Sequence, residues 1–247
     1  MKIIPLSEGS FTIDKTKVFV PFNTDTDDLQ QRPIGSLLVE VQPFCIVTDT
    51  DVILIDAGLG FKKSGELQIH QVLKANGIQP SEVTMVLMSH LHKDHAGGVA
   101  IKDMLGNGQL AFKNATYYVQ RREFEFAEAT GYPSYFTDEF DVLDRNAQVT
   151  WLHEDKGSIN DFIHYEVTGA HSKYHQVFTL QLDGKTIFFG GDDAPQLQQM
   201  KSKFVAKYDF DGKKCMELRQ QWWEQGQQEN WIFLFYHDIK TPVFPQQ

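Results

Sequence analysis

Three histidines and one aspartate fall within six consecutive positions of this chain, in the stretch HLHKDH, directly after the apolar run VTMVLM. If that run is a strand, His90 and His92 leave its end on the same side, as a two-histidine metal site requires. Asp94 and His95 follow one turn later and can reach a second ion. Solvent-exposed loop histidines are the alternative, but such clusters are typical of metal or catalytic sites.

Four further segments place polar side chains where an apolar run stops. They are Asp56 after VILI, His171 after the strand pattern FIHYEV, the pair Asp192–Asp193 after FFGG, and His237 after WIFLFY. Each of these taken singly could be a turn or loop residue. Because all of them share the same context, we expect several strand ends to converge on one rim.

The elements that must position these residues alternate between strands and helices. Apolar runs predict a strand or hairpin over 11–20, two strands within 36–58 around the turn TDTD, and further strands over 82–90, 115–120, 148–153, 162–171, 176–192 and 230–238. Helical spacing predicts helices over 65–78, 121–130 and 212–228, and 131–144 is expected to be an irregular loop or lid. This pattern favours one domain, 1–247, of two packed sheets flanked by helices.

The composition limits the class of protein and its partners. The chain has 247 residues and a formal net charge of −10, so its surface repels phosphate backbones and nucleic acid is not an expected partner. Cys45 and Cys215 form no disulfide framework, and Cys45 lies in an apolar run. The N-terminal stretch lacks the pattern of a signal peptide, and no segment has the length of a membrane span. We therefore expect a cytoplasmic protein, monomer or homodimer, without a membrane partner.

The order of these motifs resembles the metallo-β-lactamase superfamily of metallohydrolases over nearly the full chain. The resemblance implies an α/β (α+β) protein with a four-layer αββα sandwich and a dinuclear metal site. It places one ion on His90, His92 and His171, the other on Asp94, His95 and His237, and Asp192 between them, with Asp193 as the competing candidate. It also implies that Asp56 orients a ligand histidine. His175, four residues after His171, is close enough to it in the sequence for a supporting role at the site.

Within that superfamily, the stretches SHLHKDHAGG, YVQRREFEFA and FYHDIKTPVFP are similar to those of the N-acyl-homoserine lactone lactonases, a quorum-quenching group. Two stretches depart from the group: TGAHSKYH replaces its Pro-Gly-His-x-Pro-Gly-His, and Pro195 replaces a tyrosine that contacts the lactone. Tyr174 and Tyr236 are candidates for the missing hydroxyl. Phe22 and Tyr135 are further candidates for substrate contact, although aromatic side chains in the loops 18–29 and 131–140 also serve as packing.

Imidazole and carboxylate ligands suit Zn²⁺, with Mn²⁺ or Fe²⁺ as alternatives. Two such ions could share a water and lower its pKa to about 7, giving a hydroxide that attacks a lactone or ester carbonyl. Asp94 and Asp192 would be the catalytic carboxylates, and Asp192 or a bound water would protonate the departing alkoxide. A hydrolase for thioesters or phosphoesters, a di-iron redox protein and a non-catalytic binding protein remain alternatives.

Overall fold

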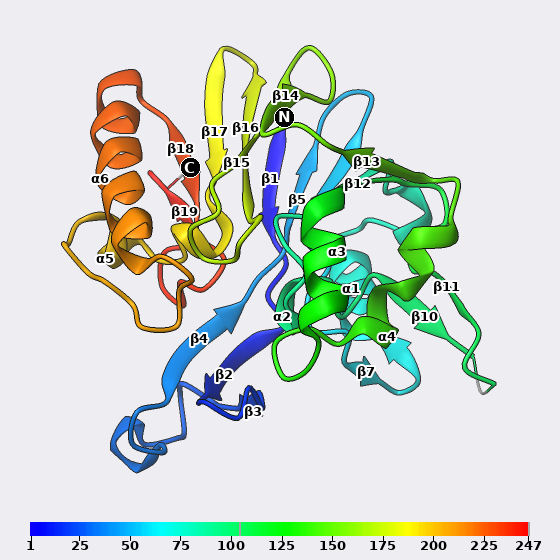
Figure 1. Ribbon diagram of the computed structural model, residues 1–247, viewed down its shortest axis with the longest axis horizontal. Helices are drawn as coiled ribbons and strands as arrows, with labels where there is room; N and C mark the ends of the chain where they lie inside the picture. The colour runs from blue at the N-terminus through cyan, green and yellow to red at the C-terminus, as the bar shows by residue number, and fades with distance from the viewer. Residues whose placement is uncertain (104, 247) are drawn as a thin grey trace.

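Two six-stranded sheets form the centre of the computed structural model, which describes residues 1–103 and 105–246 (Figure 1). The first sheet has the order β1 (Lys2–Pro5), β5 (Phe44–Val47), β6 (Val52–Ile55), β9 (Met85–Leu87), β12 (Thr116–Gln120), β13 (Val149–Leu152). The second has the order β14 (Lys156–Ser158), β15 (Ile163–Val167), β16 (Gln176–Leu182), β17 (Lys185–Phe189), β18 (Ile232–Leu234), β19 (Val243–Phe244).

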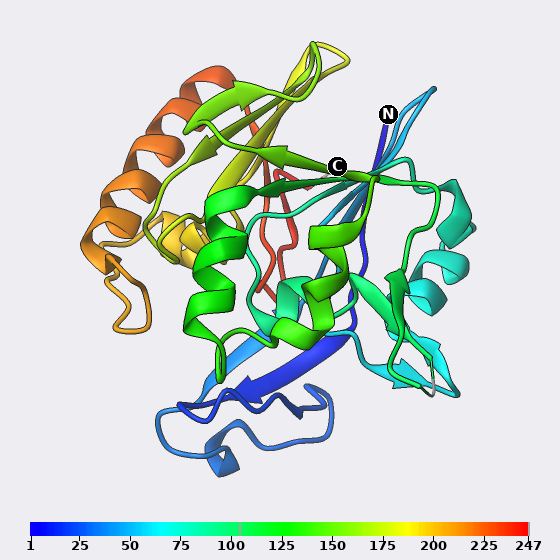
Figure 2. The ribbon, with the colours of Figure 1, turned by 45° about the vertical axis from the view of Figure 1, so that its right-hand side comes forward.

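Helices cover the outer face of each sheet, as Figures 1 and 2 show from two sides. The helices are α1 (Gln68–Ala75), α2 (Lys93–Ala96), α3 (Arg121–Thr130), α4 (Thr137–Phe140), α5 (Leu197–Met200) and α6 (Gly212–Glu229). Short 3-10 turns are η1 (Leu29–Gln31), η2 (Pro80–Glu82), η3 (Asp141–Arg145) and η4 (Gly191–Asp193). The helix predicted over 121–130 is confirmed with those bounds, and the predicted loop 131–144 contains α4. Among the described residues, no helix is both long and apolar enough to cross a bilayer.

Three hydrophobic clusters separate the four layers. In β6, Ile53 and Ile55 pack between the sheets, whereas Leu54 faces the helical layer that α1 and α3 form, because successive side chains of a strand point to opposite faces. All three are fully buried, so this strand is covered on both sides. A third cluster joins the second sheet to α6. The layers therefore run helix, sheet, sheet, helix, which confirms the predicted αββα sandwich.

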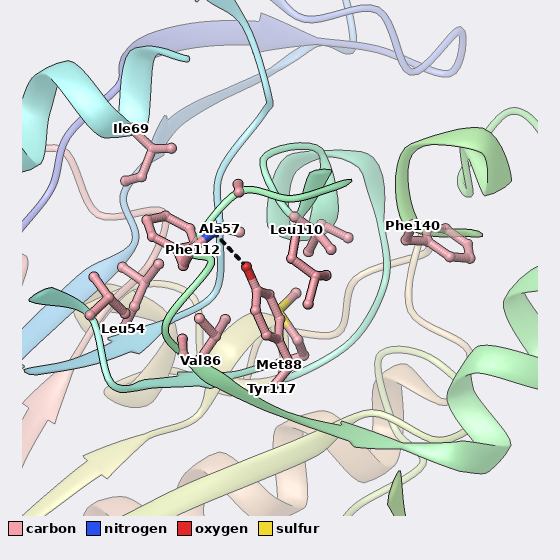
Figure 3. Close-up of a cluster of buried hydrophobic side chains, with 14 of the residues drawn as sticks. Leu54, Ala57, Ile69, Val86, Met88, Leu110, Phe112, Tyr117 and Phe140 are labelled. Carbon is pink, nitrogen blue, oxygen red and sulfur yellow. Dashed lines mark hydrogen bonds between the residues drawn. The ribbon is translucent and has the colours of Figure 1, made fainter. Parts of the chain in front are cut away.

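The cluster under α1 and α3 is drawn in Figure 3. Tyr117 of β12 lies inside it with no exposed surface, and its hydroxyl accepts a hydrogen bond from the backbone N–H of Phe112 across 2.9 Å. Burial of a hydroxyl without a hydrogen-bond partner costs free energy. This bond therefore allows the aromatic ring to fill the core while its hydroxyl keeps a partner.

A three-stranded arm projects from the sandwich at the lower edge of Figures 1 and 2. It consists of β3 (Val20–Pro21), β2 (Gly9–Ile13) and β4 (Leu37–Val41), in that order. The turn TDTD separates β5 from β6 as predicted, but the segment 36–58 forms three strands and not two, because a break at Gln42–Pro43 divides the first predicted strand into β4 of the arm and β5 of the first sheet. Two hairpins, β7 (Lys62–Lys63) with β8 (Glu66–Leu67) and β10 (Ala100–Lys102) with β11 (Gly108–Leu110), complete the strands.

Strand direction brings the polar strand ends to one edge. In the first sheet, β6 and β9 run parallel, so Asp56 and the histidine motif leave the same edge. In the second sheet, β17 and β18 run parallel, and β15 has the same direction because it is antiparallel to β16, as is β17. The residues that follow these strands include His171, Asp192 and His237. The fold thus supplies the convergence that the sequence pattern predicts.

Candidate metal centre

The first group of candidate ligands is formed by His90, His92 and His171. The Nε2 atom of His90 lies 2.9 Å from Nδ1 of His92, and Nε2 of His171 lies 3.1 Å from that same Nδ1. Together with Asp192, these residues offer ligand atoms that all lie within 4.8 Å of one another. A neutral imidazole has one donor and one acceptor nitrogen, so three converging rings cannot all satisfy one another, whereas a cation accepts lone pairs from each.

The second group is formed by Asp94, His95 and His237, and its ligand atoms also lie within 4.8 Å of one another. The Nε2 atom of His237 is 3.4 Å from Oδ2 of Asp94, and Nε2 of His95 is 3.7 Å from that oxygen. Asp94 and His95 belong to the single turn of α2, and His237 follows β18. Two sheets therefore contribute to this group.

Asp192 lies between the two groups. Its Oδ1 is 3.1 Å from Nε2 of His95 and 3.0 Å from Nε2 of His237, and its Oδ2 is 3.2 Å from Nε2 of His171. Asp193 instead points behind the site, where its oxygens accept from the hydroxyl of Thr168 and the backbone N–H of His171. Only Asp192 of this pair presents one oxygen to each group.

The buried carboxylates favour positive charge at this site, whereas the rings of His90 and His92 stay uncharged. Burial, and then neighbouring histidines, lower the pKa of His90 and His92 well below the ordinary value, so their rings are neutral and keep lone pairs for a metal. Burial also acts to lower the pKa of His95, but the carboxylates of Asp192, Asp94 and Asp56 overcome it and raise that pKa well above the ordinary value.

Two of these inward-facing atoms are also left without a hydrogen bond. The buried Nε2 of His95 and Oδ1 of Asp192 have no hydrogen-bond partner among the described residues. Unpartnered polar atoms are rare in a buried site and call for an explanation. An ion held by both residues supplies one, so the donor set fits two divalent ions.

His95 and His237 are each fixed by a hydrogen bond from the ring nitrogen that faces away from the site. Nδ1 of His95 donates to Asp56 across 2.7 Å, and Nδ1 of His237 donates to the carbonyl of Glu40 across 2.6 Å. Such partners set the tautomer and the ring orientation of metal ligands. Asp56 also accepts from the backbone N–H of Ser89 at 2.8 Å and holds a left-handed backbone at φ 59°, so the strand-end aspartate ties β6 to the histidine motif.

Two carboxylates that the sequence pattern does not indicate also support the site. Asp209, in the segment before α6, accepts from Nδ1 of His171 across 2.8 Å. Glu123, buried in the first turn of α3, accepts from the backbone N–H of Leu91 at 3.3 Å and from the hydroxyl of Ser172 at 2.9 Å. Burial raises the pKa of Glu123. Its hydrogen bonds to Leu91 and Ser172 link the segment of His90 and His92 to the segment of His171.

His175 also lies behind the metal-facing groups. Its Nε2 accepts from the backbone N–H of Asp192 at 3.2 Å, and its Nδ1 faces Oδ2 of Asp193 at 3.0 Å. His175 and Asp193 therefore hold the turn after β17 on the side away from the candidate ligands. The structure thus places His175 beside the turn that carries Asp192.

A cavity of about 720 Å³ opens over the two groups. The metal-facing side chains that line it are His92, Asp94, His171, Asp192 and His237. Part of its lining comes from the arm, with Ile13, Phe19 and Leu37, and another part comes from the segment after β17, with Pro195, Phe204 and Tyr208. The site therefore lies at the base of a mixed apolar and polar pocket large enough for a small organic molecule.

The four side chains proposed for substrate contact have other surroundings, and none lines this cavity. Tyr236 is fully buried and donates to the carbonyl of Asp94 across 2.6 Å, while its ring stacks on His95. Tyr135 donates to Glu123 beneath His92, and Tyr174 packs against Phe126. Phe22 lies in the arm, where its backbone N–H bonds to Ser10. The cavity-lining aromatic residues are Phe19, Phe204 and Tyr208 instead.

Comparison with known proteins places this geometry in a family. The model of the metallo-beta-lactamase superfamily matches residues 40–204. An N-acyl homoserine lactonase of Bacillus cereus is 26% identical over 189 residues, which are 75% of this chain and 69% of that protein. Its name describes that relative and not this chain.

Two solved structures are similar over almost the whole chain. A probable metal-dependent hydrolase from Staphylococcus aureus superposes with a TM-score of 0.78 at 22% identity, covering 98% of this chain and 91% of that one. AidC, a dizinc quorum-quenching lactonase, superposes with a TM-score of 0.73 at 15% identity, covering 98% and 88%. At these identities the likeness concerns the fold. From the matched family model and the shared fold, we conclude that this chain belongs to the metallo-beta-lactamase superfamily and is similar to N-acyl homoserine lactonases.

Proposed function

We propose that the protein is a single-domain, dinuclear metal-dependent hydrolase that opens a lactone or cleaves a carboxylic ester. The observation that carries this proposal is the position of Asp192, whose two oxygens face different histidine groups at the base of the cavity. A carboxylate in that position can hold two cations at once. The similarity to lactonases makes an N-acyl homoserine lactone the first substrate to test.

In this proposal, His90, His92 and His171 hold one ion, and Asp94, His95 and His237 hold the other. When bound, two divalent ions would lower the pKa of a water that they share and polarise the carbonyl of the substrate. Asp192 contacts both groups and is our candidate to carry the proton from the attacking water to the departing alkoxide. The chain therefore needs no serine or cysteine nucleophile.

Tyr208 is our candidate for the hydroxyl that contacts the substrate. Its side chain lines the cavity beside His171, with the two ring centroids 6.2 Å apart. Partial burial, and then the carboxylate of Asp209, raise the pKa of Tyr208 to about 12, so the hydroxyl stays protonated at neutral pH and can donate a hydrogen bond. Pro195 lines the same cavity but offers no such donor.

A hydrolysis screen of the metal-loaded protein tests this function. It should compare N-acyl homoserine lactones of several chain lengths with aryl esters, thioesters and phosphoesters. We expect turnover of lactones or esters, and loss of that turnover in Asp192→Asn but not in Asp161→Asn, an exposed loop residue. Turnover of phosphoesters alone would refute the proposed substrate class. Full activity of Asp192→Asn would refute the proposed site.

A further inference from the structure

A tight turn in the arm carries two lysines to the cavity. Lys15 and Lys17 line it from the segment between β2 and β3. The backbone N–H of Lys17 donates to the carbonyl of Asp14 across 3.0 Å, and Oδ1 of Asp14 accepts from the N–H of Thr16 at 2.8 Å. These bonds form a defined turn, so the two ammonium groups start from a fixed backbone.

Lys17 occupies a backbone conformation that its side chain does not favour. Its φ is 59°, in the left-handed region that glycine or asparagine adopts at lower cost. Strained residues of this kind concentrate at functional sites, where the strain positions a group. A lysine at this position therefore suggests that the ammonium itself is used.

The ammonium group of Lys17 is not paired with a carboxylate among the described residues. Neither Lys15 nor Lys17 forms an ion pair with any residue that the structure describes. A third cavity lysine, Lys93, differs, because it pairs with Glu139. The turn carries one acid, Asp14, and one oxygen of Asp14 accepts hydrogen bonds from Thr16. Because Lys15 and Lys17 are both cationic, the turn has one excess positive charge.

Lys15 and Lys17 line the same cavity as the candidate ligands His92 and Asp192. The chain as a whole carries a net charge of −10 and repels anions at long range. Unpaired cations on one wall of one cavity are therefore a local exception that favours an anionic ligand.

We infer that the cavity takes an ester or lactone that carries an anionic group, such as a carboxylate, on the part remote from the scissile bond. Lys17, assisted by Lys15, binds that group, while Ile13, Phe19 and Leu37 contact the carbon chain between the two ends. This inference rests on the proposed function and names its substrate class. A neutral acyl chain would leave the lysines without a partner.

Two substrates of equal length isolate the effect of the charge. 4-Nitrophenyl pentanoate and mono-4-nitrophenyl glutarate present the same scissile bond, but only the glutarate ester ends in a carboxylate. We expect kcat/KM for the glutaryl ester to exceed that for the pentanoyl ester by about tenfold or more at low salt, as a charge-assisted hydrogen bond allows. Raising the salt should shrink this ratio.

Variants at position 17 attribute the preference to the lysine. Lys17→Asn removes the charge but tolerates the positive φ, and we expect it to abolish the preference while leaving the pentanoyl ester within about threefold of the parent rate. Lys17→Arg should keep the preference. Lys213→Asn, an exposed change on α6, is the matched control and should change neither value. Equal losses on both esters in Lys17→Asn would overturn the inference.

Product binding gives a readout that needs no turnover. Calorimetry on the metal-loaded protein should show tighter binding of glutarate than of pentanoate, and Lys17→Asn should remove the difference. If neither ester is hydrolysed but this difference is found, the proposed reaction fails and the anion site stands. If the pentanoyl ester is hydrolysed without any preference or difference in binding, the anion site fails and the proposed reaction stands.

Discussion

Asp209 accepts a hydrogen bond from Nδ1 of His171 across 2.8 Å, which turns the opposite nitrogen of the ring toward Asp192. The carboxylate of Asp209 has only 2% of its side-chain surface exposed, so little water competes for the bond. The segment between α5 and α6 thereby fixes a ligand that belongs to another part of the chain. The same segment supplies Tyr208 to the cavity wall.

Replacing Asp209 should therefore weaken the binding of the ion that His171 would hold. We expect Asp209→Asn to lower the affinity of that site about 10- to 100-fold, as is typical when the partner of a ligand histidine is lost. Competition with a chelator of known affinity measures this change. Asp155→Asn, which removes an exposed ion pair with Arg122, is the control. Equal affinities in the parent and in Asp209→Asn would show that the bond does not orient the ligand.

Removing the hydroxyl of Tyr208 should slow the reaction without removing metal. We expect Tyr208→Phe to lower kcat/KM on the best substrate about 10- to 100-fold, the size of effect that loss of one donor to developing charge produces. Steady-state kinetics at matched metal content measures it. Tyr174→Phe serves as comparison, because Tyr174 packs against Phe126 and does not line the cavity. A larger loss in Tyr174→Phe than in Tyr208→Phe would reverse our assignment.

Stability should depend on pH through Glu8. This carboxyl is 4% exposed, and burial raises its pKa from 4.5 to about 7, despite the hydrogen bond that it accepts from Leu59. Between these two values the folded chain binds more protons than the unfolded chain, so stability falls as pH rises. The full loss above pH 7 amounts to roughly 3 kcal/mol.

Glu8→Gln tests this dependence, because the amide oxygen can still accept from Leu59 and carries no charge. Urea unfolding of the metal-free proteins at pH 5 and pH 8 gives the two free energies. We expect the difference between the variant and the parent to shift in favour of the variant as pH rises. The same shift in both proteins would exclude Glu8 as the titrating group.

Substitutions at two glycines would distinguish the stability cost of a steric clash from the cost of an unfavourable backbone conformation. Gly60 and Gly65 both have positive φ, of 72° and 83°, but a Cβ at Gly60 would lie 2.0 Å from the carbonyl oxygen of Gly97, whereas a Cβ at Gly65 meets nothing within 4 Å. We expect Gly65→Ala to cost about 1 kcal/mol of stability and Gly60→Ala to cost more than about 3 kcal/mol. Thermal and urea unfolding measure both. Similar costs would mean that the loop after β6 does not pack tightly on the histidine motif.

The candidate ligands could be predicted from the sequence because each follows an apolar strand. The rule that parallel strands end at the same edge then brings Asp56 and His90 together in the first sheet, and Asp192 and His237 together in the second. The packing of one sheet on the other joins the two pairs. Glu123 could not be predicted in this way. It stands in the helix RREFEFAEAT with other glutamates, and only the packing of α3 against the first sheet makes this one buried.

The walls of the cavity also depend on contacts between distant segments. Tyr208 and Lys17 lie in loops, and nothing in their neighbouring residues indicates that both loops face the same site. Tyr236, by contrast, follows an apolar strand next to a ligand, yet its hydroxyl is used by the carbonyl of Asp94. Adjacency to a ligand in the sequence therefore predicts the metal centre better than it predicts the substrate contacts.

The proposed reaction requires two ions that act together at this site. Metal-free protein titrated with Zn²⁺, with bound ions per chain and hydrolysis measured on the same samples, tests it most directly. We predict that activity rises until two ions are bound per chain, and that Asp94→Ala binds one ion and loses most of its activity. Maximal activity at one ion per chain, or full activity in Asp94→Ala, would contradict the dinuclear account.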